Sequence, residues 1–437
     1  MTAIEESRRT GALIAFERLL LERMAGRVAT SPSLATKVAW CRELWASALR
    51  IRTLRRAIPF EIATEACRSL PDAATGRLIE SWSALPDETV AIASFYGVIV
   101  PFAIDAYMRR LFTGVAAAGG NASSSLWRSR RAYQRRRRWQ AIESSDAVAG
   151  LRRLAEHRDV GLGAARVAMV AARTSAAVRE PARGRMIAAL RTGEVSEEAW
   201  FVESRDDESR YLHQLVAFEI NTFEAVTRHI AEFGGMPWEF HWDMARQVRD
   251  EVVHLGLWLD RLRKMGMPLG QYPLGLHEFT ACAGHSLAGR LALLERLIEA
   301  SALDSIDLHR CLWASRGDAA MIAYFERVQL DEIGHVRCGN KWLRWLCDDD
   351  DGLRRLVDRA ETSARERMLN EARRLERAGI VPPGNAERVR RKFDDPLQLA
   401  VDRAARLRAG FSESEVAAEV RRRHARATAH TEESIQC

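Results

Sequence analysis

Two long stretches of the sequence, residues 182–236 and 274–381, contain no proline and repeat apolar residues at helical spacing. Because proline removes a helical hydrogen bond and clashes with the preceding turn, its absence permits helices of many turns. Ala, Leu, Arg and Glu, which favour helices, are abundant, and convincing alternating strand patterns are lacking. The sequence therefore predicts an all-α fold. Long helical patterns occupy residues 207–233, 238–265, 277–302 and 317–347.

Changes in composition divide the chain into four predicted parts. A Gly- and Ser-rich stretch that continues into arginine begins at residue 119, and a strongly charged segment follows residue 350. Such stretches mark linkers and boundaries. The predicted parts are a helical N-terminal region at 1–118, a linker with connecting helices at 119–180, a helical domain at 181–350 and a charged helical C-terminal extension at 351–437.

The overall composition excludes several classes of protein. Hydrophobic residues make up 47% of the 437 residues and charged residues 29%, which is typical of a globular chain and excludes a wholly disordered one. Lys and Arg number 66 against 59 Asp and Glu, so the net charge of +7 is modest for this length. The seven cysteines include no Cys-x-x-Cys pair, which disfavours a disulfide framework and favours a reducing, cytoplasmic location.

The most apolar run of the chain, residues 90–104, is too short to span a membrane. It contains 15 uncharged residues, whereas a spanning helix needs about 20. We predict that this run is a buried helix and that the protein has no membrane partner. The sequence also lacks phosphate-loop, dinucleotide-binding, nucleophile-elbow and zinc-finger motifs, which gives little weight to nucleotide-driven, hydrolase or zinc-finger functions.

One short motif occurs twice within the helical patterns. The sequence Asp-Glu-x-x-His stands at residues 250–254 and again at 331–335. Glu and His three positions apart share one face of a helix, so both can bind the same metal ion. One copy is weak evidence in a helix-rich chain, but two copies, each on the second helix of a pair, indicate a shared metal site. The candidate ligands from the two motifs are Glu251, His254, Glu332 and His335.

Two further glutamates are spaced to complete a metal site built on four helices, which needs one more carboxylate from each remaining helix. Glu219 precedes Glu251 by 32 residues. Glu299 precedes Glu332 by 33 residues, so the two helix pairs are nearly equal in length. Both glutamates lie in apolar stretches, where an unpaired carboxylate is costly and a metal-bound one is compensated. Glu295, one turn before Glu299, is the main alternative ligand, and the choice between them remains open at this stage.

These residues make the sequence similar to the ferritin-like di-metal carboxylate superfamily. In particular it resembles a bacterial branch of unknown function with the pattern DExxH…DExGH, over roughly residues 180–350. The resemblance implies a ferritin-like four-helix bundle with additional N-terminal and C-terminal helices. It also implies six metal ligands, of which Glu251 and Glu332 would bridge the two ions. The six implied ligands are Glu219, Glu251, His254, Glu299, Glu332 and His335.

The resemblance gives a role to the aspartate that opens each motif. A metal-bound imidazole usually donates its other N–H to a carboxylate, which sets the orientation of the ring. In this superfamily the aspartate typically serves the histidine of the opposite helix. We therefore predict that Asp250 supports His335 and that Asp331 supports His254, the alternative being two solvated charges.

The resemblance also implies the cofactor and the reaction class. Mixed carboxylate and imidazole ligands suit Fe(II) or Mn(II), and two iron ions with O2 as co-substrate are the expected set, with manganese as the alternative. We expect a non-haem di-iron oxidase or oxygenase that acts on a small organic substrate, for example in specialised metabolism. Electrons would come from an external donor, and a homodimer remains open.

Two other functions stay open at the level of sequence. Seven arginines crowd residues 128–138 between Trp127 and Trp139, and such patches can bind phosphates and stack bases. The second hypothesis is therefore a hydroxylase of the tRNA-modifying type, in which the arginine-rich segment binds the RNA. An exposed linker is the simpler interpretation of this charge run. A non-catalytic metal-binding scaffold is the third hypothesis.

Overall fold

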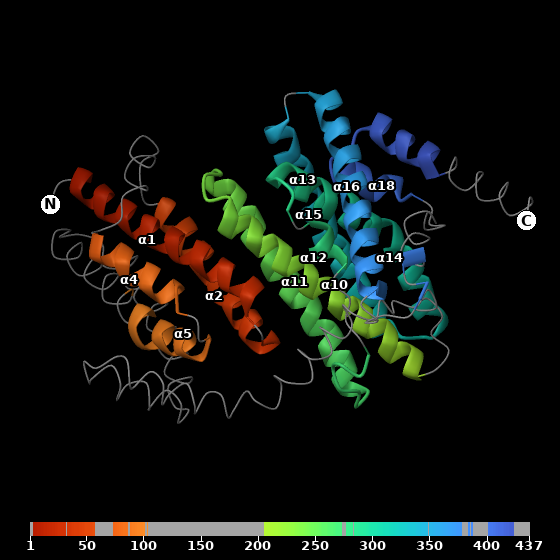
Figure 1. Cartoon of the computed structure of the whole chain (residues 1–437), viewed down its shortest axis with the longest axis horizontal. Helices are drawn as coiled ribbons and strands as arrows, with labels where there is room; N and C mark the ends of the chain where they lie inside the picture. Colours follow the sequence, from red (N-terminus) through yellow and green to blue (C-terminus); the bar gives the residue numbers. More distant parts are fainter. Residues whose placement is uncertain are drawn as a thin grey trace, which may run out of the picture. The chain divides into compact units, whose positions relative to one another are not determined.

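In the computed structural model, every regular element of the described chain is a helix (Figure 1). The absence of β-strands among the described residues confirms the predicted all-α class. The chain divides into two compact units, residues 1–180 and 181–437. None of the helices in the described part of the chain combines the length and the hydropathy that a membrane crossing requires. The described residues are 3–31, 33–56, 73–85, 88–100, 103, 205–272, 277–282, 284–347, 349–377, 383–384, 386–387 and 401–423.

The first unit is built around two long helices that pack along each other. Its elements are α1 (Ala3–Thr30), α2 (Leu34–Arg55), α4 (Ala73–Ser83), α5 (Glu88–Ser94) and the π-helical η1 (Phe95–Ile99). Helix α4 lies against α1. The rings of Trp40, Trp82 and Phe95 meet with centroid separations between 5.1 and 5.7 Å. These aromatic side chains are buried and contribute to the core of the unit, because large rings remove much apolar surface from water.

The apolar run at residues 90–104, predicted as a buried helix, contains a change of helix type. Its first residues belong to α5 and the next five to η1, where Phe95 and Ile99 are buried. Residues 101, 102 and 104 of the run lie outside the described residues.

The first helix pair of the second unit follows the sequence pattern closely. Helix α10 spans Arg205–Glu232 and α11 spans Trp238–Lys264. The connection contains Gly234 and Gly235, and Pro237 stands immediately before the first turn of α11. Glycine after one helix and proline at the start of the next are the expected stop and start signals.

The second helix pair departs from the prediction at its start. The pattern at 277–302 predicted one helix, whereas the structure has a short α12 (His277–Cys282) and a new helix that begins at Leu287. Gly284, with a φ of 75°, lies in the connection, and the Ser286 hydroxyl accepts a hydrogen bond from the backbone N–H of Gly289. The new helix runs through α13 (Leu287–Leu291), the π-helical η3 (Ala292–Ile298) and α14 (Glu299–Ser315), and α15 (Ala319–Leu346) follows it.

The two helix pairs contact each other along both sides. Helix α11 packs against α15, which in turn packs against η3 and α14. On the opposite side, the Tyr211 hydroxyl of α10 lies 2.7 Å from His309 Nδ1 of α14. The four long helical segments therefore enclose one interior, to which each contributes buried side chains.

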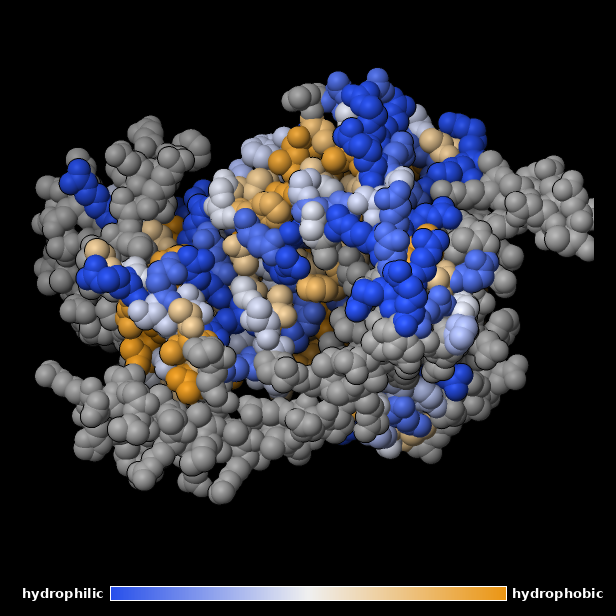
Figure 2. Space-filling model, viewed as in Figure 1, coloured by the Kyte–Doolittle hydropathy of each residue, from blue (hydrophilic) through white to orange (hydrophobic). Residues whose placement is uncertain are grey.

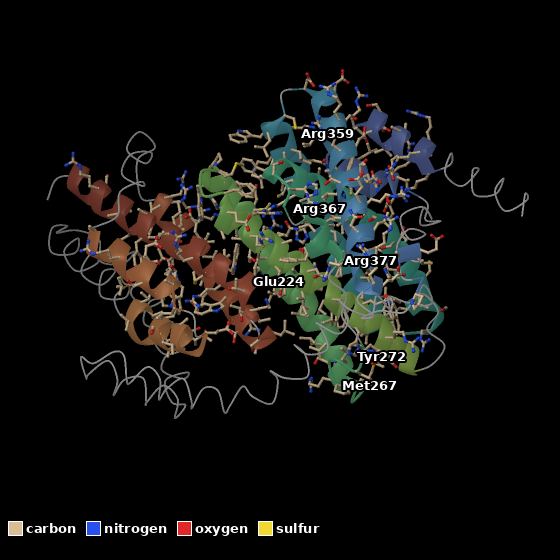
Figure 3. All side chains as sticks on the ribbon, viewed as in Figure 1. Glu224, Met267, Tyr272, Arg359, Arg367 and Arg377 are labelled. Carbon is tan, nitrogen blue, oxygen red and sulfur yellow. The ribbon has the colours of Figure 1, made fainter. Side chains whose placement is uncertain are left out.

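Helix α16 (Asp350–Arg377) covers α12, α13 and η3. It buries Leu353, Ala360 and Ala364, which recur at helical spacing. Its exposed face is mainly hydrophilic (Figure 2), and Arg359, Arg367 and Arg377 stand along the length of the helix (Figure 3). Helix α18 (Arg403–Arg408) and a helical stretch at 413–423 follow in the sequence, and α18 contacts α14 and α15.

Candidate metal centre

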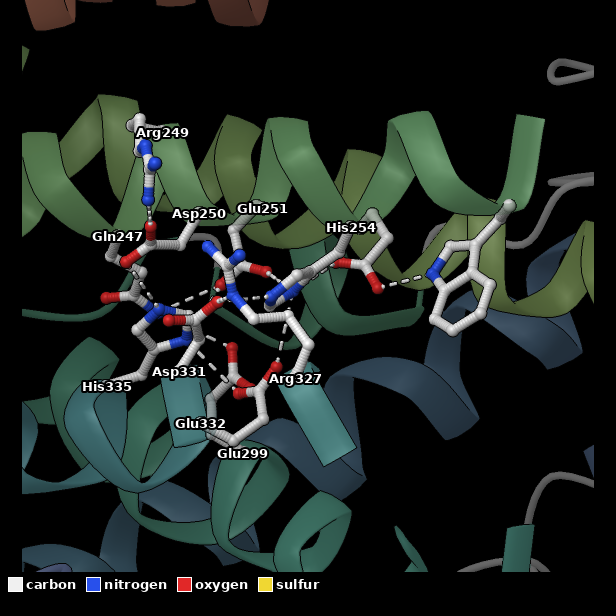
Figure 4. A network of polar contacts seen from close by, with 12 residues as sticks. Gln247, Arg249, Asp250, Glu251, His254, Glu299, Arg327, Asp331, Glu332 and His335 are labelled. Atoms are coloured by element: carbon white, nitrogen blue, oxygen red, sulfur yellow. Dashed lines mark hydrogen bonds and ion pairs between the residues drawn. The ribbon is translucent and has the colours of Figure 1, made fainter. Parts of the chain in front are cut away.

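The interior of the second unit brings together the six side chains that the resemblance implied as ligands (Figure 4). Each of the four long helical segments contributes at least one of them. All are buried, with exposed fractions between 0% and 4%. The six are Glu219 on α10, Glu251 and His254 on α11, Glu299 on α14, and Glu332 and His335 on α15.

Two glutamates, Glu251 and Glu332, lie between the two imidazoles. Oε2 of Glu251 is 3.3 Å from His254 Nδ1, and its Oε1 is 3.2 Å from His335 Nδ1. Oε1 of Glu332 is 3.6 Å from His254 Nδ1, and its Oε2 is 3.1 Å from His335 Nδ1. Each carboxylate thus directs one oxygen toward each histidine, which is the arrangement that a bridging carboxylate requires.

The donor atoms fall into two groups of the size that holds one ion each. Glu251, Glu299, Glu332 and His335 offer atoms within 4.8 Å of one another, and Glu219, Glu251 and His254 do the same. Glu251 belongs to both groups. The geometry therefore suits two ions that share a ligand.

The outer nitrogen of each histidine faces an aspartate from the opposite helix. Asp331 Oδ2 lies 3.2 Å from His254 Nε2, and Asp250 Oδ2 lies 3.6 Å from His335 Nε2. Arg327 Nε donates to Asp331 Oδ2 at 2.8 Å, so this aspartate is paired on both sides. The Asp331 contact holds the His254 ring with Nδ1 directed inward. The Asp250 contact is longer, and neither Asp250 Oδ2 nor His335 Nε2 has a hydrogen-bond partner among the described residues.

Asp250 is held by arginines on its own helix. Arg249 donates to its Oδ1, and Arg246 Nε lies 3.6 Å from its Oδ2. Each aspartate is therefore paired with arginine on the side away from the cluster, while its negative charge also faces the imidazole of a histidine.

Burial and neighbouring charges raise the pKa of two glutamates in this cluster and lower that of a third. Burial raises the pKa of Glu219 to about 8, although His254 acts to lower it. Burial also raises the pKa of Glu299, and the negative charges of Glu332 and Glu251 raise it further. Burial acts to raise the pKa of Glu251 as well, but the neighbouring imidazoles of His335 and His254 bring it well below its ordinary range.

The residues fit a pair of bound cations. Four carboxylates are buried together, and one oxygen each of Glu219, Glu251 and Glu299 has no hydrogen-bond partner among the described residues. His254 Nδ1 also lacks one. Buried polar atoms are normally satisfied, and clustered oxygen and imidazole donors without hydrogen bonds are the donor set of a metal site.

Two side chains near the cluster were not identified from the sequence as part of the site. Trp258 donates from Nε1 to Glu219 Oε1 at 2.8 Å. Gln247 donates from Nε2 to Glu295 Oε2 at 2.9 Å and lies 3.4 Å from Glu251 Oε1. Gln247 stands four residues before Glu251 and Trp258 four residues after His254, so helical spacing alone places both on the ligand face.

The structure also addresses the alternatives that the sequence left open. Glu299 belongs to the four-residue donor group, and Glu295 belongs to neither group. Both are fully buried. The arginine-rich segment at 128–138 lies outside the described residues. The five cysteines that the structure describes are free of disulfide bonds.

Comparison with known proteins gives a family and a short match. The family model described as "Protein of unknown function (DUF455)" matches residues 140–383, which include all six candidate ligands. An uncharacterized protein of Haemophilus influenzae (strain ATCC 51907 / DSM 11121 / KW20 / Rd) is 33% identical over 106 residues. The match covers 24% of this chain and 37% of the Haemophilus protein. No solved structure matches the chain.

Proposed function

Because the chain belongs to the DUF455 family of proteins of unknown function, we propose that its buried carboxylate–histidine cluster is a di-metal centre and that the protein is a di-iron, O2-dependent oxidoreductase. The fold would be a ferritin-like four-helix bundle with additional helices. The substrate would be a small organic molecule, with electrons from an external donor. The observation that carries the proposal is the position of Glu251 and Glu332, each with one oxygen toward each histidine.

The charge of the cluster supports two divalent ions. The carboxylates of Glu219, Glu251, Glu299 and Glu332, when ionised, balance the charge of two divalent cations. Burying four carboxylates without cations would be strongly unfavourable. Mixed oxygen and imidazole donors suit Fe(II) and also Mn(II), and two bound iron ions would supply the reduction of O2 and an oxidant for the substrate.

The chain's own residues have three tasks in this proposal. Asp331 and Asp250 orient the imidazoles, so that Nδ1 of each ring faces the ions. Trp258 holds one oxygen of Glu219, which leaves the other oxygen for an ion. The almost complete burial of the six ligands excludes water, which protects a reactive centre from side reactions.

Anaerobic loading with Fe(II) tests the proposal. The full chain, purified without added metal salts, is expected to bind two iron ions and then to consume O2 rapidly with a transient absorbance. Failure to bind metal in stoichiometric amounts would contradict the site itself. Two tightly bound ions without O2 uptake beyond slow autoxidation would contradict the enzyme and favour a metal-binding scaffold.

A further inference from the structure

Tyr211 of α10 and His309 of α14 form a buried pair that is separate from the six candidate ligands. The exposed fraction is 2% for Tyr211 and 5% for His309. The Tyr211 hydroxyl lies 2.7 Å from His309 Nδ1, within hydrogen-bond distance. In the tautomer of His309 that carries its hydrogen on Nε2, Nδ1 accepts the phenolic hydrogen. An acid and a base are therefore in direct contact in the interior of the second unit.

Burial keeps both members of this pair uncharged. It raises the pKa of the Tyr211 phenol well above its ordinary range, and the charge of Glu208 acts in the same direction. Burial also lowers the pKa of His309 to about 3. At neutral pH the phenol is therefore protonated, and the imidazole is neutral and can accept a proton. A phenol that cannot ionise loses an electron most easily when its proton leaves at the same time, and His309 Nδ1 is a base within reach of that proton.

A series of aromatic contacts connects this pair with a candidate metal ligand. The His309 ring stacks on Phe325 of α15 with a centroid separation of 4.6 Å and an interplanar angle of 4°. The Phe325 ring lies 5.2 Å from the Trp258 ring of α11, again between centroids. Trp258 Nε1 donates to Glu219 Oε1 at 2.8 Å. All four side chains are buried, so a dry and closely packed path joins the pair to the cluster, across which an electron can pass.

A second tyrosine near Trp258 differs from Tyr211 in its surroundings. Tyr324 of α15 lies 6.3 Å from the Trp258 ring between centroids, and its side chain is only half-buried. No hydrogen bond joins its hydroxyl to a histidine within the described part of the chain. Oxidation of Tyr324 would therefore leave its proton without a neighbouring imidazole, whereas Tyr211 has one in contact.

We propose that Tyr211 is a one-electron relay of the di-iron centre and that His309 is its proton acceptor. The proposal rests on the proposed di-iron function. Once the centre has been oxidised by O2, Tyr211 gives it one electron along the path through Phe325 and Trp258, and the phenolic O–H bond breaks as the proton moves to His309 Nδ1. An electron from the external donor then reduces the neutral tyrosyl radical, and His309 returns the proton. The donor can thus reduce a centre whose ligands are almost completely buried.

Electron paramagnetic resonance of the full chain tests the proposal. Iron-loaded protein is mixed with O2 in the absence of an external donor and frozen at successive times. The wild-type protein is expected to show the signal of a tyrosyl radical, which narrows when its tyrosines are deuterated on the ring. Tyr211→Phe should lose the signal, and Tyr324→Phe, the matched control, should keep it. His309→Gln, which accepts a hydrogen bond but is not a base, should lower the yield of radical at least about tenfold.

Iron content shows whether the variants keep their fold. All three substitutions leave the candidate ligands in place, so each variant should bind two iron ions. Rapid O2 uptake by the wild-type protein without a tyrosyl signal, or a signal that survives in Tyr211→Phe, would overturn the relay and leave the di-iron centre intact. If Tyr211→Phe failed to fold, an undiminished signal in His309→Gln would overturn it instead. A wild-type protein that binds no iron, or binds it without taking up O2, would overturn both proposals.

Discussion

The two helix pairs of the second unit carry the same motif but surround it differently. In the first pair, α10 and α11 are regular α-helices, and Trp258 holds the single carboxylate that α10 supplies, Glu219. In the second pair, a π-helical segment precedes Glu299 and brings a second buried acid, Glu295, beside the site. Similar ligand spacing therefore does not produce equivalent surroundings for the two candidate ions.

The C-terminal segment adds to this difference because α18 packs against α14 and α15 of the second pair. Arg406 of α18 donates to Asp304 through Nε at 3.0 Å and through Nη2 at 2.7 Å, and also to the carbonyl oxygen of Ala300. Asn340 of α15 donates to the carbonyl oxygen of Ala409. Ala300 follows Glu299 directly, so residues 401–423 support the helix that carries this ligand.

Removal of the shared carboxylate should have the largest effect on metal content. Glu251 belongs to both donor groups, whereas Glu219 belongs to one. We expect Glu251→Ala to lose both ions and Glu219→Ala to lose one. Metal analysis of the purified variants measures the difference. If Glu251→Ala retained two ions per chain, the shared position of this residue would be wrong.

Breaking the contact between the C-terminal segment and α14 should cause the next largest effect, on stability. Asp304→Ala leaves the buried guanidinium of Arg406 without its carboxylate and should lower the free energy of unfolding by about 3 kcal/mol. Asp307→Ala, on the same helix but exposed, should change it by less than about 0.5 kcal/mol. Urea unfolding of both variants checks this, and equal effects would show that the segment does not support the second pair.

Lower pH should weaken the contact between α10 and α14. Burial lowers the pKa of His309 from 6.5 to about 3. Below pH 6.5 His309 therefore binds a proton in the unfolded chain but stays neutral in the folded protein. The contribution of this residue to stability is fully present above pH 6.5 and is lost as the pH falls toward 3. At pH 5 the loss from this residue is about 2 kcal/mol.

His309→Gln tests this pH dependence, because glutamine can accept the Tyr211 hydrogen bond and does not titrate. The variant should lose less stability between pH 7 and pH 5 than the wild-type protein. Urea unfolding at the two pH values measures the loss, and identical losses would exclude His309 as its source.

The smallest predicted effect compares the two supporting aspartates. Asp331 Oδ2 lies 3.2 Å from His254, and Asp250 Oδ2 lies 3.6 Å from His335. We expect Asp331→Asn to weaken binding of the ion at His254 about tenfold. Asp250→Asn should weaken binding of the ion at His335 by less. Titration with Co(II) gives both affinities. A larger effect for Asp250→Asn would reverse the comparison.

Much of the arrangement around the cluster follows from local patterns in the sequence. Helical periodicity and the glycines and prolines between helices predicted α10, α11 and α15 to within a few residues. The duplicated motif predicted which helix faces meet, because Glu and His three positions apart must share a face. The role of these side chains as metal ligands stays a prediction that the experiments above address.

Other features depend on contacts that a linear pattern does not contain. The π-helical turn at η3 and the break between α12 and α13 were not predicted, since the periodicity of residues 277–302 fits one continuous helix. The closeness of Gly339 to Glu295 also became visible only in the structure, because the two residues lie on different helices.

The sequence by itself determined the helical class of this protein and the helix faces that carry Glu251, His254, Glu332 and His335, because helix periodicity and motif spacing are properties of neighbouring residues. The spacing left the choice between Glu299 and Glu295 open. Only the tertiary structure decided what surrounds those side chains. The contacts of Gln247, Trp258 and Arg406 join segments that are far apart in the chain. Such contacts arise from how whole helices pack, which depends on the shapes of both partners at once.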